Sequence, residues 1–121
     1  MQKILAVFIG GGLGSIVRYG ISRLIEVGEL NIKPLATFFS NIMATALLGL
    51  ILFFAVEKYQ LSEPFQAFLI IGFCGGFSTF STFSFETFEL MRSGNILMAV
   101  FYAFISMILG LLVLFVISKS L

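Results

Sequence analysis

Four long apolar stretches, separated by short polar connections, constrain this chain more than any other feature of its sequence. A helix needs roughly 20 residues to cross a hydrocarbon core about 30 Å thick. The stretches cover residues 4–25, 35–56, 65–90 and 96–118, and the connections between them contain EVGELNIKP, EKYQLSEP and RSGN. No soluble domain fits in connections this short. The sequence therefore predicts an all-α integral membrane protein, with residues 1–121 forming a single domain of four transmembrane helices.

The composition agrees with this prediction and argues against an enzyme. The chain is 60% hydrophobic and 11% charged, whereas roughly a quarter of the residues of a soluble domain are charged. It has no His, a single Cys, and Glu as its only acidic residue type. The usual hydrolytic triads and zinc sites need the missing residues. A cleaved signal peptide is an alternative for the first stretch, but Arg18, Arg23 and Glu26 follow without a convincing cleavage site.

The positive charges give no preferred orientation in the membrane. When the ends of the stretches are assigned alternately to the two sides of the membrane, one side carries three positive charges and the other carries four. The three are Lys3, Lys58 and Lys119, and the four are Arg18, Arg23, Lys33 and Arg92. Because Lys and Arg near helix ends set topology, this balance favours insertion in both orientations. Equal numbers of up and down copies pair about a two-fold axis in the membrane plane, as inverted repeats do in transporters. The alternative is that the count carries no information in so small a protein.

Polar or small residues recur every four positions on three of the stretches, which places them on single helix faces. Gly10 and Gly14 suit close helix packing, and GGGLGS lacks the strand and helix context of a dinucleotide-binding motif. Arg18 either reaches the interface or lines a watery vestibule, where it attracts anions. Asn41 is costly in hydrocarbon without partners, so its amide makes an interhelical hydrogen bond or faces a permeating ion. The other two stripes are Thr37, Asn41 and Thr45, and Tyr102, Ser106 and Gly110.

The third stretch is longer than a single span requires. As one straight helix, residues 65–90 would measure about 39 Å. Gly72, Gly75 and Gly76 near its middle predict a broken helix. The freed backbone groups of such a break are tolerated only in a protein interior or a water-lined cavity. Discontinuous membrane helices are therefore candidates for ion sites.

The segment CGGFSTFSTFSFE, residues 74–86, combines aromatic rings with hydroxyl groups. Phe77, Phe80 and Phe83 recur every three residues along one helical edge. The edge of an aromatic ring is weakly positive, so rings aimed edge-on into a narrow conduit attract an anion, while hydroxyls donate hydrogen bonds. The alternative for these Phe residues is lipid contact or core packing.

These motifs resemble the Fluc (CrcB) family of fluoride channels over almost the whole chain. The matching stretches are GGGLGSIVRY at 10–19, ATFFSN at 36–41 and GFCGGFSTFSTFSFE at 72–86, of which the last is highly specific. The resemblance implies an antiparallel, dual-topology dimer with two pores, each built from both subunits. It also implies a prokaryotic plasma membrane protein that passively exports cytoplasmic fluoride and so relieves its toxicity.

The resemblance assigns roles to individual residues. Phe80 and Phe83 are implied as pore aromatics, Asn41 as their polar partner and Arg18 as the vestibule cation. The rest of the implied fluoride pathway is Thr37, Ser81, Thr82, Glu86, Tyr102 and Ser106.

A buried, structural Na⁺ on the dimer axis is also implied, bound by the backbone carbonyls of Gly75 and Ser78 from each subunit. Carbonyl oxygens at helix ends suit a hard cation. The sequence departs from the family pattern at four positions, which are Ala36, Ser40, Ala44 and Gly110. These departures leave open a pairing of two non-identical subunits, whereas the intact pore residues favour a homodimer.

Two other functions compete with a channel. Small multidrug or guanidinium exporters also have four helices, but they rely on a membrane-embedded Glu in the first helix, and here the first stretch has no acid before Glu26. A non-conducting accessory subunit would explain the glycines but not the FSTFSTF array. Both alternatives predict no selective fluoride flux.

Overall fold

The computed structural model describes residues 1–27 and 33–121, and the regular structure of these residues is helical. The connection EVGELNIKP falls largely on residues 28–32, which lie outside the described residues. Four helical segments are long and apolar enough to cross a membrane: Gln2–Val27, Lys33–Tyr59, Glu63–Arg92 and Ile96–Ser120. The predicted set of four apolar spans is therefore confirmed, with each segment reaching its predicted span or extending slightly beyond it.

Two of the four segments are composite. The second contains an α-helix, a π-helical turn and a short α-helix, and the third contains four separate helical elements. In chain order the elements are α1 (Gln2–Val27), α2 (Lys33–Leu50), the π-helical η1 (Ile51–Ala55), α3 (Val56–Tyr59), α4 (Glu63–Gln66), the π-helical η2 (Ala67–Cys74), α5 (Gly75–Phe77), α6 (Phe80–Arg92) and α7 (Ile96–Ser120).

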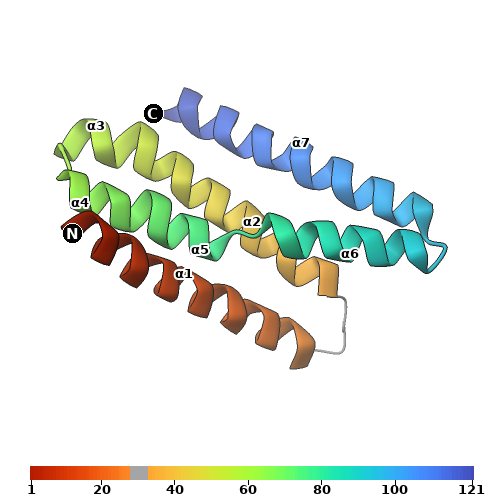
Figure 1. Ribbon diagram of the computed structural model, residues 1–121. Coiled ribbons are helices and arrows are strands. Elements are labelled where there is room, and N and C mark those ends of the chain that lie inside the picture. The colour runs from red at the N-terminus through yellow and green to blue at the C-terminus, as the bar shows by residue number, and fades with distance from the viewer. Residues whose placement is uncertain (28–32) are drawn as a thin grey trace.

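The segments lie side by side and alternate in direction (Figure 1). The N-terminus, the α3–α4 connection and the C-terminus lie at one end of the bundle, and the α6–α7 connection lies at the other. The third segment runs through the middle of the bundle, with α1 against η2 and α5, and with α2 and α7 against α6. The FSTFSTF repeat therefore faces helices that are distant from it in sequence.

Glycines bring α1 and the third segment into backbone contact, and we call this contact the glycine seam. Gly10 and Gly14 are buried on α1. A Cβ atom built on Gly14 would overlap the carbonyl oxygen of Phe73, and one built on Gly76 would overlap the carbonyl oxygen of Gly11. The prediction that the α1 glycines serve close helix packing is confirmed.

Both described connections carry local stop and start signals. At the end of α6, Gly94 has φ +88°, and the Asn95 N–H donates to the Leu90 carbonyl over 2.9 Å. This is a Schellman motif, in which glycine at positive φ lets the last carbonyls find donors. In the other connection, Gln60 ends α3 in the left-handed region, and Pro64 lies in the first turn of α4, where it removes no helical hydrogen bond.

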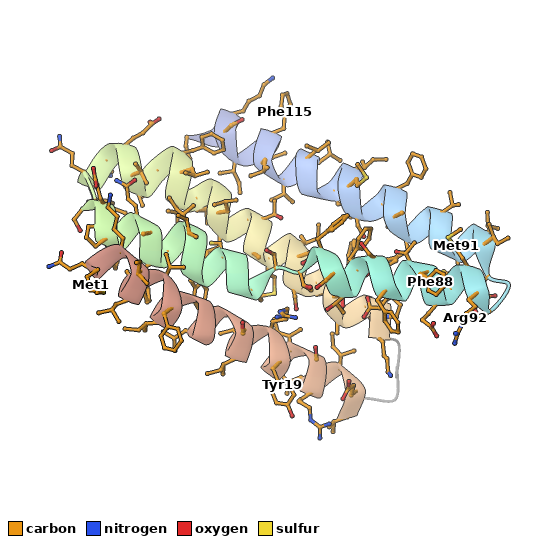
Figure 2. All side chains as sticks on the ribbon, viewed as in Figure 1. Met1, Tyr19, Phe88, Met91, Arg92 and Phe115 are labelled. Atoms are coloured by element: carbon orange, nitrogen blue, oxygen red, sulfur yellow. The ribbon has the colours of Figure 1, made fainter. Side chains whose placement is uncertain are left out.

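Large apolar side chains point away from the bundle over much of its surface (Figure 2). Tyr19, Phe88 and Phe115 are labelled examples, and each is more than half exposed. A contiguous apolar surface of this extent is not tolerated on a soluble monomer. Lipid chains cover it when the four segments span a bilayer, so the chain is a multi-pass membrane protein.

Candidate functional site

Two extended residues interrupt the third segment between α5 and α6. Ser78 has φ −84° and ψ 160°, and Thr79 has φ −152° and ψ 121°. We call these two residues the extended step. The three glycines at which a break was predicted are themselves helical: Gly72 lies in η2, and Gly75 and Gly76 form part of α5. The interruption thus follows the glycines rather than falling on them.

The side chain of Asn41 on α2 holds the extended step at two points. Its Nδ2 donates to the Thr79 carbonyl over 3.1 Å, and its Oδ1 accepts from the Thr79 N–H over 2.7 Å. A buried carboxamide is stable when both its donor and its acceptor are paired. Of the two alternatives predicted for Asn41, the structure contains the interhelical hydrogen bond.

Thr79 in turn caps α6. Its Oγ1 accepts a hydrogen bond from the Thr82 N–H over 3.2 Å, which is the role of a threonine at the N-cap position. The hydroxyls of Thr82 and Ser81 lie 3.1 Å and 3.3 Å from the same Oγ1. Two residues of the predicted fluoride pathway, Ser81 and Thr82, are therefore gathered around Thr79, which was not among the predicted pathway residues.

These contacts leave two carbonyls of the third segment without their usual donors. In a continuous α-helix the Thr79 N–H would donate to the Gly75 carbonyl, and the Thr82 N–H to the Ser78 carbonyl. Here Asn41 and the Thr79 hydroxyl accept those two hydrogen bonds instead. Gly75 and Ser78 also line a cavity of about 170 Å³ between α2 and the third segment.

Phe80, Phe83 and Tyr102, the aromatic residues of the implied fluoride pathway, form one cluster, whereas Phe77 is buried against Phe73. The Phe80 and Phe83 ring centroids are 6.0 Å apart, and those of Phe83 and Tyr102 are 5.1 Å apart. Phe83 is half-buried between α6 and α7, whereas Phe80 is 80% exposed. One chain alone therefore does not enclose the Phe80 ring.

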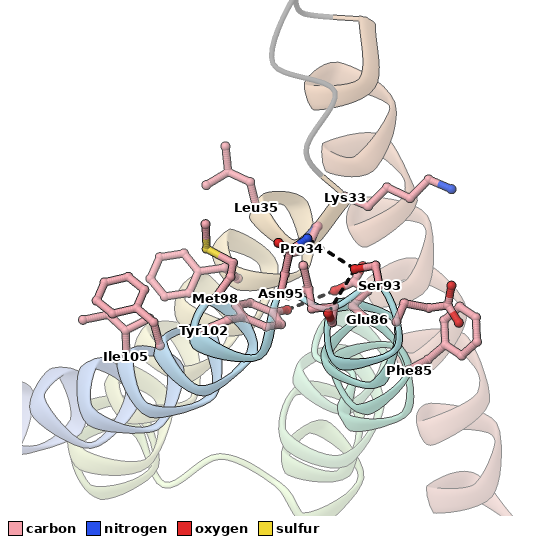
Figure 3. A pocket seen from close by; sticks show the side chains of 14 residues that line it. Lys33, Pro34, Leu35, Phe85, Glu86, Ser93, Asn95, Met98, Tyr102 and Ile105 are labelled. Atoms are coloured by element: carbon pink, nitrogen blue, oxygen red, sulfur yellow. Dashed lines mark hydrogen bonds between the residues drawn. The ribbon is translucent and has the colours of Figure 1, made fainter.

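Glu86 joins α2, α6 and α7 at the far end of this cluster. Its two carboxylate oxygens accept hydrogen bonds from Thr37 over 2.8 Å and from Tyr102 over 3.0 Å. Glu86 and Tyr102 line a cavity of about 930 Å³, which Lys33 also lines (Figure 3). A carboxylate held by two hydroxyls is oriented by charge-assisted hydrogen bonds, so the predicted Thr37, Glu86 and Tyr102 form one polar group.

Two predicted residues have different surroundings. The Ser106 hydroxyl, one helical turn beyond Tyr102, is buried without a hydrogen-bond partner among residues 1–27 and 33–121. Arg18 is not placed among the α2, α6 and α7 side chains, because its Nε donates to the Gly76 carbonyl over 3.1 Å. Ser15, which was not predicted as a site residue, donates to the same carbonyl over 3.5 Å.

The sequence profile of the family described as "CrcB-like protein, Camphor Resistance (CrcB)" matches residues 5–117. Three relatives are each 41% identical to this chain and bear the name "Fluoride-specific ion channel FluC". The protein of Azobacteroides pseudotrichonymphae aligns over 110 residues, which are 91% of this chain and 88% of the relative. The corresponding figures are 117 residues, 93% and 90% for Bacteroides fragilis, and 116 residues, 95% and 91% for Thermus thermophilus.

The profile and all three relatives span nearly the whole chain, including the three stretches on which the resemblance to Fluc (CrcB) proteins was noted. The resemblance to the Fluc (CrcB) family is therefore confirmed. The relatives are named as ion channels, which is not an enzymatic function. This chain belongs to the CrcB-like protein family.

Proposed function

We propose that this protein is a fluoride-selective channel through which fluoride leaves the cytoplasm passively. The family and the names of the relatives support this function. The observation that carries it is that the predicted pathway residues gather between α2, α6 and α7. Asn41 and Thr82 both contact Thr79, and Tyr102 contacts both Phe83 and Glu86. These contacts bring amide, hydroxyl and aromatic groups together between α2, α6 and α7.

Such a set of groups suits fluoride because several weak donors replace part of a tightly held hydration shell. Hydrogen fluoride crosses a membrane as a neutral weak acid and ionises in a less acidic cytoplasm, where the anion is trapped. An open pathway lets the anion leave along its gradient. The membrane potential assists, since about 2.3 kcal/mol per 100 mV acts on each charge. The process needs no nucleotide and no proton carrier.

The pore is completed by a second, antiparallel copy. The 80% exposure of Phe80 supports this, because a ring assigned to the pathway needs a surface on its other side. The balanced Lys and Arg count supports insertion in both orientations. An isologous pair of identical faces closes with two-fold symmetry, so each copy contributes Phe80, Phe83 and Asn41 to the assembly.

A structural Na⁺ fits the carbonyls of Gly75 and Ser78. Both have lost their usual helical donors to side chains, and both line the 170 Å³ cavity between α2 and the third segment. The described residues contain no cluster of three His, Cys, Asp or Glu side chains, so backbone oxygens are the ligands that suit a hard cation here. When bound, the ion supplies positive charge for carbonyl oxygens that are costly to leave unpaired.

Fluoride flux from liposomes tests the channel. Purified protein is reconstituted in liposomes loaded with potassium fluoride, a potassium ionophore is added, and an electrode follows external fluoride, with chloride-loaded liposomes run in parallel. We expect rapid fluoride release with negligible chloride release, because the donors along the pathway match a small, strongly hydrated anion. Absence of fluoride release from folded protein in the presence of Na⁺ would refute the homodimeric channel.

Labelling of a single engineered thiol tests the dual topology. Ser93 is exposed in the α6–α7 connection, so Ser93→Cys places a thiol at one end of the bundle, while the native Cys74 is only 4% exposed. In sealed vesicles, a membrane-impermeant maleimide is expected to label about half of the Ser93→Cys chains, because unbiased positive charges give both orientations. Permeabilised vesicles and the parent protein are the controls. Complete labelling, or none, in sealed vesicles contradicts dual topology.

A further inference from the structure

We propose that Asn41 and Thr79 are positioning residues for the cation site, because each removes an amide hydrogen from a carbonyl that the cation needs. The inference deepens the function proposed above and rests on its Na⁺ site. Neither side chain is a ligand in this proposal. Both act through the backbone of the third segment.

The first argument is the pairing of donors across the extended step. Asn41 Oδ1 accepts from the Thr79 N–H over 2.7 Å, and that N–H is the helical donor for the Gly75 carbonyl. Thr79 Oγ1 accepts from the Thr82 N–H over 3.2 Å, and that N–H is the helical donor for the Ser78 carbonyl. Asn41 thus frees the Gly75 carbonyl and Thr79 frees the Ser78 carbonyl. These are the two carbonyls that were assigned to the cation.

The second argument is that Asn41 fixes the direction of the Thr79 backbone as well as its donor. Its Nδ2 also donates to the Thr79 carbonyl over 3.1 Å, so the peptide groups on both sides of Thr79 are held by one carboxamide. A carboxamide carries one acceptor and one donor group on the same rigid plane. An aliphatic side chain in place of Asn41 leaves both of these backbone groups to find partners within their own helix.

Without these holds, the third segment can close into a continuous helix. Ser78 and Thr79 would then adopt helical dihedral angles, and the Gly75 and Ser78 carbonyls would regain their amide donors. A cation reaches such a carbonyl only after the backbone hydrogen bond is broken. One bond of this kind weakens binding roughly threefold to tenfold.

The test measures how Na⁺ stabilises the purified dimer in detergent. Thermal unfolding is followed while Na⁺ replaces N-methylglucamine at constant ionic strength. A ligand that binds only the folded state raises the melting temperature as the ligand concentration increases. For Asn41→Leu and Thr79→Val, we expect the Na⁺ concentration at half-maximal stabilisation to rise roughly threefold to tenfold. Thr79→Ser retains a capping hydroxyl and is expected to behave as the parent.

Thr87→Val is the matched control for the loss of a hydroxyl on α6. Thr87 Oγ1 donates to the Phe83 carbonyl over 2.8 Å, within the helix and away from the extended step. The Thr87→Val variant should change the melting temperature by the same amount at every Na⁺ concentration. If Asn41→Leu does not fold, the comparison of Thr79→Val with Thr79→Ser tests the inference alone.

Three outcomes are informative. A shifted Na⁺ dependence in Thr79→Val that Thr79→Ser restores supports the inference. An unshifted dependence in Asn41→Leu and Thr79→Val overturns it, even when both melt at a lower temperature than the parent. A parent protein whose melting temperature does not respond to Na⁺ overturns the cation site and this inference together, whereas the fluoride-flux experiment still decides whether the protein is a channel.

Discussion

Replacing Phe80 with isoleucine is expected to slow fluoride release from liposomes roughly 10- to 100-fold, which corresponds to a barrier higher by about 1.4–2.7 kcal/mol. The Phe80 ring lies 6.0 Å from that of Phe83, and the weakly positive ring edge is the group that an aliphatic side chain cannot supply. Isoleucine fills similar apolar volume, so the change removes the ring rather than the packing. The fluoride electrode measures the rate directly.

Phe88→Ile on the same helix is the control for this prediction. Phe88 is 56% exposed and points away from the bundle in Figure 2. We expect its flux to match that of the parent, and size-exclusion chromatography should show the same assembly for both variants. Equal flux in the parent and Phe80→Ile would remove Phe80 from the pathway. Equal loss in Phe80→Ile and Phe88→Ile would mean that the effect is not specific to the pathway.

Gly14→Ala is expected to destabilise the protein by about 3 kcal/mol, at the upper end of the usual cost of overpacking. Alanine normally stabilises a helix relative to glycine by about 0.5–1 kcal/mol. A loss of stability in Gly14→Ala would therefore come from crowding at the glycine seam and not from helix propensity. The new methyl group would meet the Phe73 carbonyl oxygen. That atom belongs to the backbone and cannot move aside by changing a rotamer.

Gly12→Ala provides the comparison two residues away on α1. A Cβ atom on Gly12 meets nothing within 4 Å, so this variant should be as stable as the parent or more stable by up to about 1 kcal/mol. Unfolding of both variants in mixed detergent micelles with increasing dodecyl sulfate gives the two free energies. Identical unfolding curves for Gly12→Ala and Gly14→Ala would show that α1 does not pack through Gly14.

The number and extent of the spans could be predicted because the bilayer imposes a length and requires each backbone to satisfy its own hydrogen bonds. The seam was predictable for a related reason, since small residues four apart mark the face on which one helix approaches another. Gly10 and Gly14 showed that face without any knowledge of the partner. The partner itself, the backbone around Phe73, did not follow from the spacing.

The position of the extended step was not predictable from local sequence. Glycine flexibility pointed to Gly72, Gly75 and Gly76, yet the extended residues are Ser78 and Thr79. The Thr79 backbone is bonded by Asn41, which is 38 positions away in sequence. The threonine preceding Phe80 carried the one local signal, since Thr is a favoured N-cap residue.

The π-helical elements η1 and η2 could not be predicted from the residue pattern either. Residues 67–74, AFLIIGFC, are apolar on all sides, and hydrophobic periodicity distinguishes helix types only when polar residues mark one face.

The contact of Arg18 could not be predicted for a different reason. A long cationic side chain reaches water, a vestibule or a carbonyl equally well, and only the arrangement of α1 against α5 selects the Gly76 oxygen.

The glycine seam also sets an order of events during synthesis. Ser15 and the Gly76 carbonyl that it contacts are 61 residues apart, so at 5–20 residues per second the ribosome needs roughly 3 to 12 s to deliver the second side of the contact after the first. During that interval the glycine face of α1 has no partner within its own chain. The seam can therefore close within its own chain only once the third segment has been synthesised.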